Sequence, residues 1–175
     1  MMTALSATIL GIIEGITEFL PVSSTAHLIL AADLMKIGEA ASTKTFEIAI
    51  QSGAILAVVV LYWRYFLDIE KLKKIMFAFI PTGVIGLLLY KIVKTYLLGN
   101  TAIVLAALAL GGAFLIVFEK VFQGRAGEGR RDISYRDAWV IGICQSLAII
   151  PGVSRSASTI VGGLGLGISR ETIVE

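Results

Sequence analysis

Three long apolar runs constrain the fold of this chain more than any other feature. They cover residues 46–63, 75–93 and 101–118, and the third contains no charged residue. Because a helix needs about 17–25 mostly apolar residues to cross the hydrocarbon core of a bilayer, each run predicts a membrane-spanning helix. Of the 175 residues, 57% are hydrophobic and 16% are charged, whereas about 25% are charged in soluble domains. We therefore expect an all-α polytopic membrane protein.

The rest of the composition excludes several other classes. The formal net charge is only +2, which argues against a basic surface for nucleic acid. Cys144 is the only cysteine, so the chain is not a disulfide scaffold. We expect the bilayer itself as a partner and no nucleic acid.

The basic residues predict how the chain is oriented in the membrane. Residues 64–74 hold four Lys or Arg residues and residues 119–137 hold five, whereas residues 36–44 hold two. The two rich segments are separated by two spans, so they lie on one side, and the positive-inside rule makes that side cytoplasmic. We expect a multi-pass protein of the cell (inner or plasma) membrane, with a cytoplasmic loop at 119–137 and residues 36–44 outside.

Two further apolar segments are each interrupted by a polar turn that contains proline. Residues 3–35 break at Pro21, and the segment from residue 138 to 168 breaks at Pro151. Proline donates no backbone hydrogen bond, and the groups that it frees are tolerated at membrane depth only inside protein or against a water-filled cavity. We expect two re-entrant helix pairs whose tips meet near the membrane midplane.

The two interrupted segments align without a gap at an offset of 131 residues. The identical pairs include Gly11 and Gly142, Ile12 and Ile143, Val22 and Val153, Ser23 and Ser154, Ala26 and Ala157, and Ile29 and Ile160. Three spans lie between the pairs, so the second pair enters from the opposite side, which is an inverted-topology repeat. Residues 1–131 then form the first repeat and residues 138–175 the start of a second one.

The first interrupted segment carries polar residues that are costly in a membrane. Glu14 and Glu18 share one helix face, and a charge at membrane depth costs about 2.5–3.5 kcal/mol on insertion scales. Either the two carboxylates pair with Arg155 and stabilise the fold, or they take part in the function of the site. Ser24 and His27 are i, i+3 neighbours after Pro21, so the only histidine is a candidate catalytic partner of a serine or a structural residue. Ser23 or Ser24 is expected to cap the helix.

The second interrupted segment predicts an anion site. Arg155 offers a planar fork of donors that suits phosphate, and Gly152 allows a close approach of the backbone to a ligand. The hydroxyl groups of Ser154, Ser156 and Thr159, together with the N-terminus of the following helix, add further donors. A role as counter-ion to a carboxylate, or in binding a transported anion, stays open.

The two polar turns resemble the motifs of a known family. The stretches EGITEFLPVSSTAH at 14–27 and PGVSRSAST at 151–159 are similar to the two motifs of the undecaprenyl-diphosphatase, or bacitracin-resistance, family. The resemblance implies a membrane phosphatase that converts undecaprenyl diphosphate to the monophosphate, recycles the lipid carrier of cell-wall synthesis and confers bacitracin resistance. It also implies a divalent cation, Mg²⁺ or Ca²⁺, and no organic cofactor. Glu14 and Glu18 would either hold this cation or orient His27.

The resemblance also implies roles for individual residues. Ser24 is expected as the nucleophile, His27 as its base or as the direct nucleophile, and Glu14, Glu18 and Arg155 as the rest of the catalytic core. Ser23, Ser154, Ser156, Thr159 and Gly152 are expected to bind phosphate. A carrier that flips a prenyl phosphate is the alternative, because inverted repeats are also transporter architecture. A homodimer stays open, and Glu47 and Gln51 either line the same cavity or face the interface.

The repeat also predicts that the bundle is incomplete. Three spans follow the first helix pair and none follows the second, so about three helices are expected to be missing. Either the chain is a fragment or partner chains fill the gap, and we expect the 175-residue chain alone to be poorly active.

Overall fold

The computed structural model describes residues 2–38, 40–97, 99–122 and 129–174, and these residues are almost wholly helical. The described part of the chain contains no β-strand beyond a single bridge between Arg130 and Ile168. The α-helices are α1 (Ala4–Thr17), α2 (Ser24–Leu34), α3 (Ala41–Leu61), α4 (Ile69–Ile92), α5 (Thr101–Phe122), α6 (Tyr135–Gln145), α7 (Arg155–Gly165) and α8 (Arg170–Val174). Short helical pieces are η1 (Tyr65–Leu67), η2 (Val93–Leu97) and η4 (Ser146–Ile149). The expected all-α class is confirmed.

The three longest helices coincide with the three expected spans but differ from them at their ends. Segments Ala41–Leu61, Ile69–Leu97 and Thr101–Phe122 are long and apolar enough to cross a membrane. The second begins six residues before the expected 75, because Asp68 accepts hydrogen bonds from the N–H groups of Glu70 and Lys71 and so starts the helix among charged residues. The third continues past 118, so the expected loop 119–137 is partly helical; its residues 123–128 lie outside the described residues.

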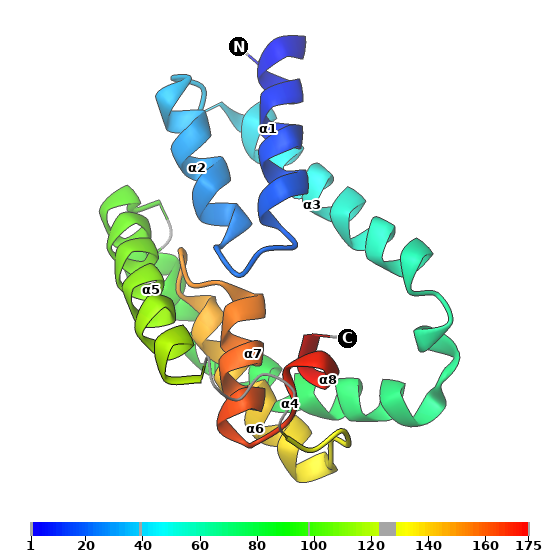
Figure 1. Ribbon diagram of the computed structural model, residues 1–175. Coiled ribbons are helices and arrows are strands. Elements are labelled where there is room, and N and C mark those ends of the chain that lie inside the picture. The colour runs from blue at the N-terminus through cyan, green and yellow to red at the C-terminus, as the bar shows by residue number, and fades with distance from the viewer. Residues whose placement is uncertain (1, 39, 98, 123–128, 175) are drawn as a thin grey trace.

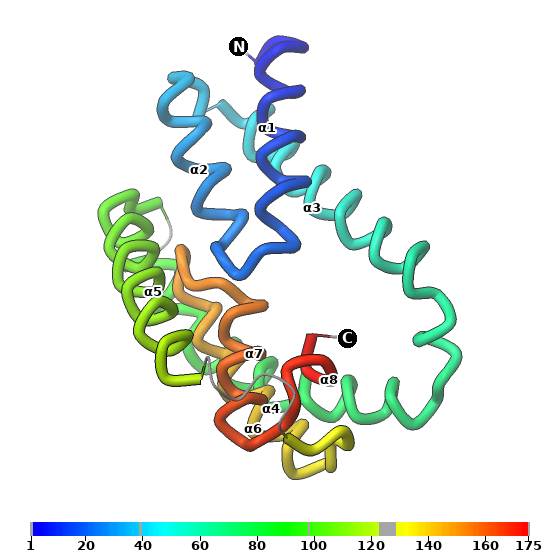
Figure 2. Tube along the Cα trace, viewed as in Figure 1, coloured from blue at the N-terminus to red at the C-terminus, as the bar shows by residue number. Residues whose placement is uncertain are grey.

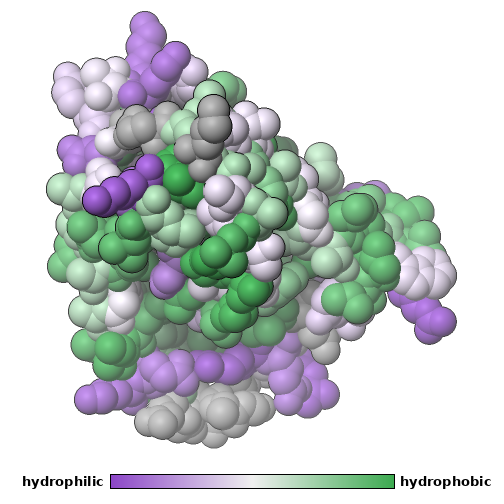
Figure 3. All heavy atoms as spheres, turned by 90° about the horizontal axis from the view of Figure 1, so that it is seen from above, coloured by the Kyte–Doolittle hydropathy of each residue, from purple (hydrophilic) through white to green (hydrophobic). Residues whose placement is uncertain are grey.

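These long helices expose most of their apolar side chains. Almost nothing of α3 is buried, and little of α4 or α5 is. Figure 3 shows apolar side chains over much of the face seen from above. Such a surface fits hydrocarbon or further helices rather than water. The membrane location of the protein follows from these helices.

The first helix pair is a hairpin with its own apolar core. Thr3 caps α1 in a reciprocal arrangement with Ser6, which fixes where the helix begins. Leu10, Leu28, Ala32 and Ile37 are buried together between α1 and α2, and residues of α3 pack on this cluster. This core holds α1 and α2 together, and the turn near Pro21 lies at the other end of the hairpin.

The second helix pair packs on α4 through a glycine. A Cβ atom at Gly142 would collide with the carbonyl oxygen of Ala78 and lie 2.7 Å from Cγ of Pro81. The hydroxyl group of Thr82 donates a hydrogen bond of 2.7 Å to the carbonyl of Gly142. Pro81 can thus lie inside α4, because the neighbouring helix covers the break that it makes.

The two hairpins correspond residue by residue at the offset of 131. Helices α1 and α6 begin at Ala4 and Tyr135, while α2 and α7 run from Ser24 to Leu34 and from Arg155 to Gly165. The second helix of each pair, α2 or α7, also ends in the same way. Lys36 and Gly167 have positive φ values of 57° and 76°. The next residues, Ile37 and Ile168, donate backbone hydrogen bonds to Ala32 and Gly163. This is the glycine-type C-cap in which a left-handed residue ends a helix.

The hairpins point at each other from opposite ends of the molecule. In Figure 1, α1 runs from the end that holds the N-terminus toward the middle, and α6 runs to the same place from the other end. Figure 2 shows that the turns of the two hairpins approach each other there, while α3 leads away to the far end. The arrangement has the geometry of an inverted repeat, and its depth in a membrane stays a prediction.

Candidate active site

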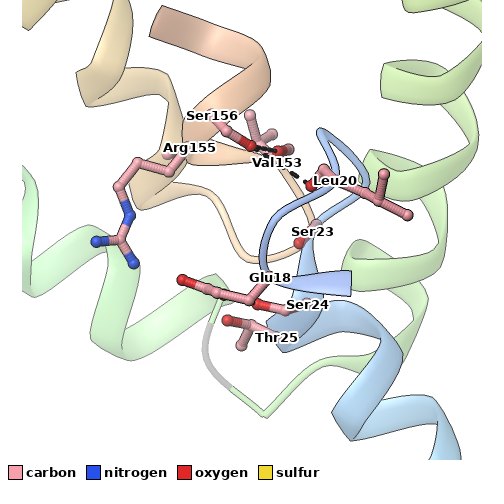
Figure 4. A pocket seen from close by; sticks show the side chains of 10 residues that line it. Glu18, Leu20, Ser23, Ser24, Thr25, Val153, Arg155 and Ser156 are labelled. Carbon is pink, nitrogen blue, oxygen red and sulfur yellow. Dashed lines mark hydrogen bonds between the residues drawn. The ribbon is translucent and has the colours of Figure 1, made fainter. Parts of the chain in front are cut away.

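The turns of the two hairpins enclose a cavity of about 180 Å³. Both hairpins supply its walls, as Figure 4 shows. The lining residues are Glu18, Leu20, Ser23, Ser24, Thr25, Ala148, Val153, Ser154, Arg155 and Ser156. A hydrogen bond of 3.5 Å from the hydroxyl of Ser156 to the carbonyl of Leu20 joins the two turns. The cavity thus exists only because segments more than a hundred residues apart meet.

A serine and a carboxylate are paired within the cavity. Glu18 ends α1 and Ser24 begins α2, and the turn through Pro21 brings their side chains together. The hydroxyl of Ser24 donates a hydrogen bond to Oε2 of Glu18. The Ser24 hydroxyl is thus oriented by a group that can accept its proton.

His27 makes a different contact from the one expected. Its Nδ1 lies 2.9 Å from the carbonyl oxygen of Ser23, and the residue does not line the cavity. A helical side chain leans toward the N-terminus of its helix, so the ring reaches the carbonyl four residues back rather than Ser24, three residues back. The expected pairing of Ser24 with His27 is not formed; Ser24 pairs with Glu18.

Ser23 and Ser154 hold equivalent positions before α2 and α7 but behave differently. Ser154 is extended, and its hydroxyl accepts a hydrogen bond from the N–H of Ala157, so it caps α7. Ser23 has a φ of 64°, and its hydroxyl makes no capping bond, although it is the residue before the helix. Ser23 is buried and lines the cavity. The first turn of α2 therefore keeps N–H groups that no side chain caps.

Arg155 is a cation without a carboxylate partner among the described residues. It is exposed at the start of α7, and no ion pair or hydrogen bond of its guanidinium is formed within the described ranges. Figure 4 shows the guanidinium on one side of the cavity, apart from the hydroxyls of Ser23 and Ser24. The alternative in which Glu14 and Glu18 neutralise Arg155 to hold the fold is therefore wrong here. Its donors are free for an anion.

Three other expected site residues lie away from the cavity. Glu14 is 2% exposed, does not line the cavity, and neither carboxylate oxygen has a hydrogen-bond partner among the described residues. Thr159 donates to the carbonyl of Ser156. Gly152 approaches α5, since a Cβ atom there would lie 2.6 Å from the carbonyl oxygen of Val104, so its φ of 101° serves helix packing rather than a ligand.

Several lining residues were not expected from the sequence. Thr25 lies in the first turn of α2, and its hydroxyl is 3.5 Å from Nε2 of Gln51, which ties α3 to the site. Gln51 therefore approaches the site through Thr25, whereas Glu47 does not line the cavity. The sequence could have indicated Thr25, because this residue follows Ser24 at the start of a helix. Leu20, Ala148 and Val153 are apolar, and nothing in their types distinguishes them.

The chain also matches known proteins over nearly its whole length. The family described as Bacitracin resistance protein BacA matches residues 7–175. The chain belongs to the BacA family. Among BacA relatives, the undecaprenyl-diphosphatase of Sulfurihydrogenibium sp. is 50% identical over 99% of this chain and 69% of its own length. Proteins of the same name from Aquifex aeolicus and Methanococcus aeolicus are 51% and 42% identical, again over 99% of this chain and 69% of theirs. Both polar turns that form the cavity lie inside the BacA match.

Proposed function

We propose that this chain carries the active site of a membrane enzyme that hydrolyses undecaprenyl diphosphate to undecaprenyl phosphate and phosphate. Such an enzyme recycles the lipid carrier of cell-wall synthesis at the plasma (inner) membrane and so confers resistance to bacitracin. One observation supports this function best. The paired Ser24 and Glu18 share a cavity with the free guanidinium of Arg155, and this supports a mechanism in which a nucleophile and its base act beside a cation that binds the phosphate.

The proposed reaction begins with attack by Ser24. Its Oγ attacks the terminal phosphorus while its proton passes to Glu18. The bond from that phosphorus to the bridging oxygen breaks, and the prenyl phosphate leaves with the electron pair and takes the proton from Glu18, which returns to its carboxylate form. Water then attacks the phosphoserine and releases phosphate, with Glu18 acting first as the base for the water and then as the acid that returns the proton to Oγ.

Electrostatic stabilisation comes from both hairpins in this proposal. Arg155 of the second hairpin neutralises the equatorial phosphoryl oxygens, and the uncapped N–H groups of α2 approach them from the first. Ser23, Ser154 and Ser156 line the same cavity and supply hydroxyl donors. Groups of both hairpins would therefore stabilise the charge of the transition state.

A divalent cation fits the acidic residues of the first hairpin. Mg²⁺ is commonly bound by one or two carboxylates together with water and substrate phosphates, and the buried oxygens of Glu14 have no partner among the described residues. Glu14 and Glu18 would hold Mg²⁺ or Ca²⁺, and when bound the ion would supply charge neutralisation at the diphosphate. The described residues include no group of three or more acidic, histidine or cysteine side chains for it.

The test is release of phosphate from undecaprenyl diphosphate by the protein in detergent. Arg155→Ala should lower kcat/KM by about 100-fold or more, because one preorganised charge-stabilising donor contributes that much. Arg136→Ala is the matched control, since it removes an exposed arginine of α6 that does not line the cavity. Equal rates for both variants would contradict the proposed site.

A carrier of prenyl phosphates is the second candidate. The hairpins that meet turn to turn favour it, since this geometry is found in secondary transporters. The phosphate-release assay distinguishes the enzyme from the carrier. Phosphate release in detergent, where no gradient exists, supports the enzyme, and lipid movement between leaflets of sealed vesicles without phosphate release supports the carrier.

A further inference from the structure

His27 has one ring nitrogen whose role the structure defines. Nδ1 lies 2.9 Å from the carbonyl oxygen of Ser23, which also accepts the backbone N–H of His27 at 3.3 Å. A carbonyl oxygen can only accept a hydrogen bond, so Nδ1 must carry the proton. Because the bond made by one ring nitrogen sets the state of the other, Nε2 of the neutral ring is left unprotonated.

The second hairpin contains the same bond without a ring. Ser158 stands 131 residues after His27, and its hydroxyl donates a bond of 2.9 Å to the carbonyl of Ser154, the equivalent of Ser23. Ser158 is buried and does not line the cavity. The fold thus places a donor against this carbonyl in both halves, and in the second half a hydroxyl is sufficient.

We infer that Ser23 is a positioning residue whose backbone carbonyl holds His27 as the Nδ1-protonated tautomer, so that Nε2 is the only ring nitrogen open to proton exchange. His27 therefore has one group that Ser158 lacks, the ring nitrogen Nε2. The inference rests on the proposed function only for the use of Nε2 in phosphate release. The tautomer itself is a property of the folded chain without substrate.

The tautomer can be read directly because the chain has one histidine. Protein labelled with ¹⁵N-histidine and placed in lipid nanodiscs gives the signals of a single ring. At a pH where the ring is neutral, we expect a protonated Nδ1 and an unprotonated Nε2. A protonated Nε2, or an averaged mixture of both tautomers, would overturn the inference even if the protein hydrolyses the diphosphate.

Substitutions separate the shared bond from the nitrogen that His27 adds. His27→Ser recreates the bond that Ser158 makes, and His27→Asn puts an amide N–H where Nδ1–H lies, so both should unfold at the temperature of the wild type. His27→Ala loses the bond and should unfold at a lower temperature, as should Ser158→Ala. The Ser and Asn variants should nevertheless release phosphate more slowly than the wild type, because neither has Nε2.

One result in this set would count against the role of Nε2. Wild-type turnover in His27→Ser or His27→Asn would show that the bond to Ser23 is all that His27 provides. Ser158→Ala is the matched control for loss of the bond alone, and it should keep its turnover per folded molecule. If the wild type itself releases no phosphate, the proposed function fails, while the NMR result still decides the tautomer.

Discussion

Ser23 and Ser154 show how one residue type serves two purposes at equivalent positions. Ser154 caps α7, whereas the left-handed backbone of Ser23 turns its hydroxyl away from α2. A left-handed conformation costs a non-glycine residue about 1–2 kcal/mol, and such strain is concentrated at functional sites. The strain therefore leaves the start of α2 open to a ligand in the half that carries the nucleophile.

This contrast gives a prediction at the residue scale. Ser154→Ala should destabilise the fold by about 1 kcal/mol, the usual cost of losing a capping side chain. Ser23→Ala removes no capping bond, so it should leave stability nearly unchanged and raise KM for the diphosphate. Thermal unfolding in detergent and phosphate release measure the two effects. Equal loss of stability in both variants would contradict the assigned difference.

Some residues expected in the site line one cavity, whereas the side-chain pairing expected from spacing does not form. The motifs identified Glu18, Ser24 and Arg155, and all three line one cavity. The pairing of Ser24 with Glu18 depends on how the turn folds back on α1, and the pairing of His27 with Ser23 depends on side-chain direction along the helix. Spacing along the chain specifies neither of these geometries.

Helix packing explains why equivalent glycines differ. Gly142 lies against the backbone of α4, whereas a Cβ atom at Gly11, its equivalent in α1, would meet no atom within 4 Å among the described residues. Gly142→Ala should therefore force α6 from α4 and destabilise the protein by about 1–3 kcal/mol. Gly11→Ala should be neutral or stabilise by up to about 1 kcal/mol. Thermal unfolding of both variants checks this, and a larger loss for Gly11→Ala would show that α6 packs differently.

A buried carboxylate fixes the open end of the second hairpin. Arg130 donates hydrogen bonds to both oxygens of Asp137, and Ser134 donates to the same carboxylate. Arg130 also donates to the carbonyl of Leu166. Arg130 first, and Ser134 next, hold the pKa of Asp137 at about 2, below its ordinary value of 3.8. The start of α6 is thereby fastened to the end of α7.

The lowered pKa predicts a pH dependence with a definite sign. The folded state favours the carboxylate, so Asp137 contributes stability above its ordinary pKa of 3.8, and this contribution disappears as the pH falls through about 2. Asp137→Asn should therefore unfold at a lower temperature than the wild type at pH 6, with a smaller difference near pH 2.5. Asp132→Asn is the control, since that side chain is 89% exposed. An Asp137 difference that stays constant with pH would contradict the assignment.

The limits of the helices show what sequence patterns detect. Apolar runs predicted all three spans, because hydrophobicity is a property of a whole segment. The start of α4 was predicted too late, because Asp68 caps a helix whose first two turns are charged. Caps are local and depend on one hydrogen bond, so they move a boundary without changing the apolar pattern.

At the scale of the whole molecule, the two similar halves of the repeat carry different polar residues at equivalent positions. At equivalent positions the first half has Glu18, Ser24 and His27, and the second has Ile149, Arg155 and Ser158. The first half thus supplies the carboxylate, the hydroxyl and the ring, and the second supplies the cation. Neither turn alone encloses the cavity, so the opposed approach of the hairpins is what makes a site of them.

The orientation in the membrane is the prediction that belongs to this scale. The connector between α3 and α4 and the start of α6 lie toward one end of the molecule, opposite the N-terminus, and both are rich in basic residues. The positive-inside rule makes that end cytoplasmic. Cys144 is the only cysteine, so Cys144→Ala gives a background without thiols for single-cysteine labelling.

In that background, a membrane-impermeant thiol reagent added to intact cells should label Ser42→Cys, at the outer start of α3. It should label Arg64→Cys and Arg131→Cys only after permeabilisation, since both are exposed at the basic end. The background protein should stay unlabelled in both conditions. Because α3 connects residues 42 and 64, labelling of both from the same side would show that α3 does not span the bilayer. A reversed pattern would keep the span and place the basic end outside, against the charge rule.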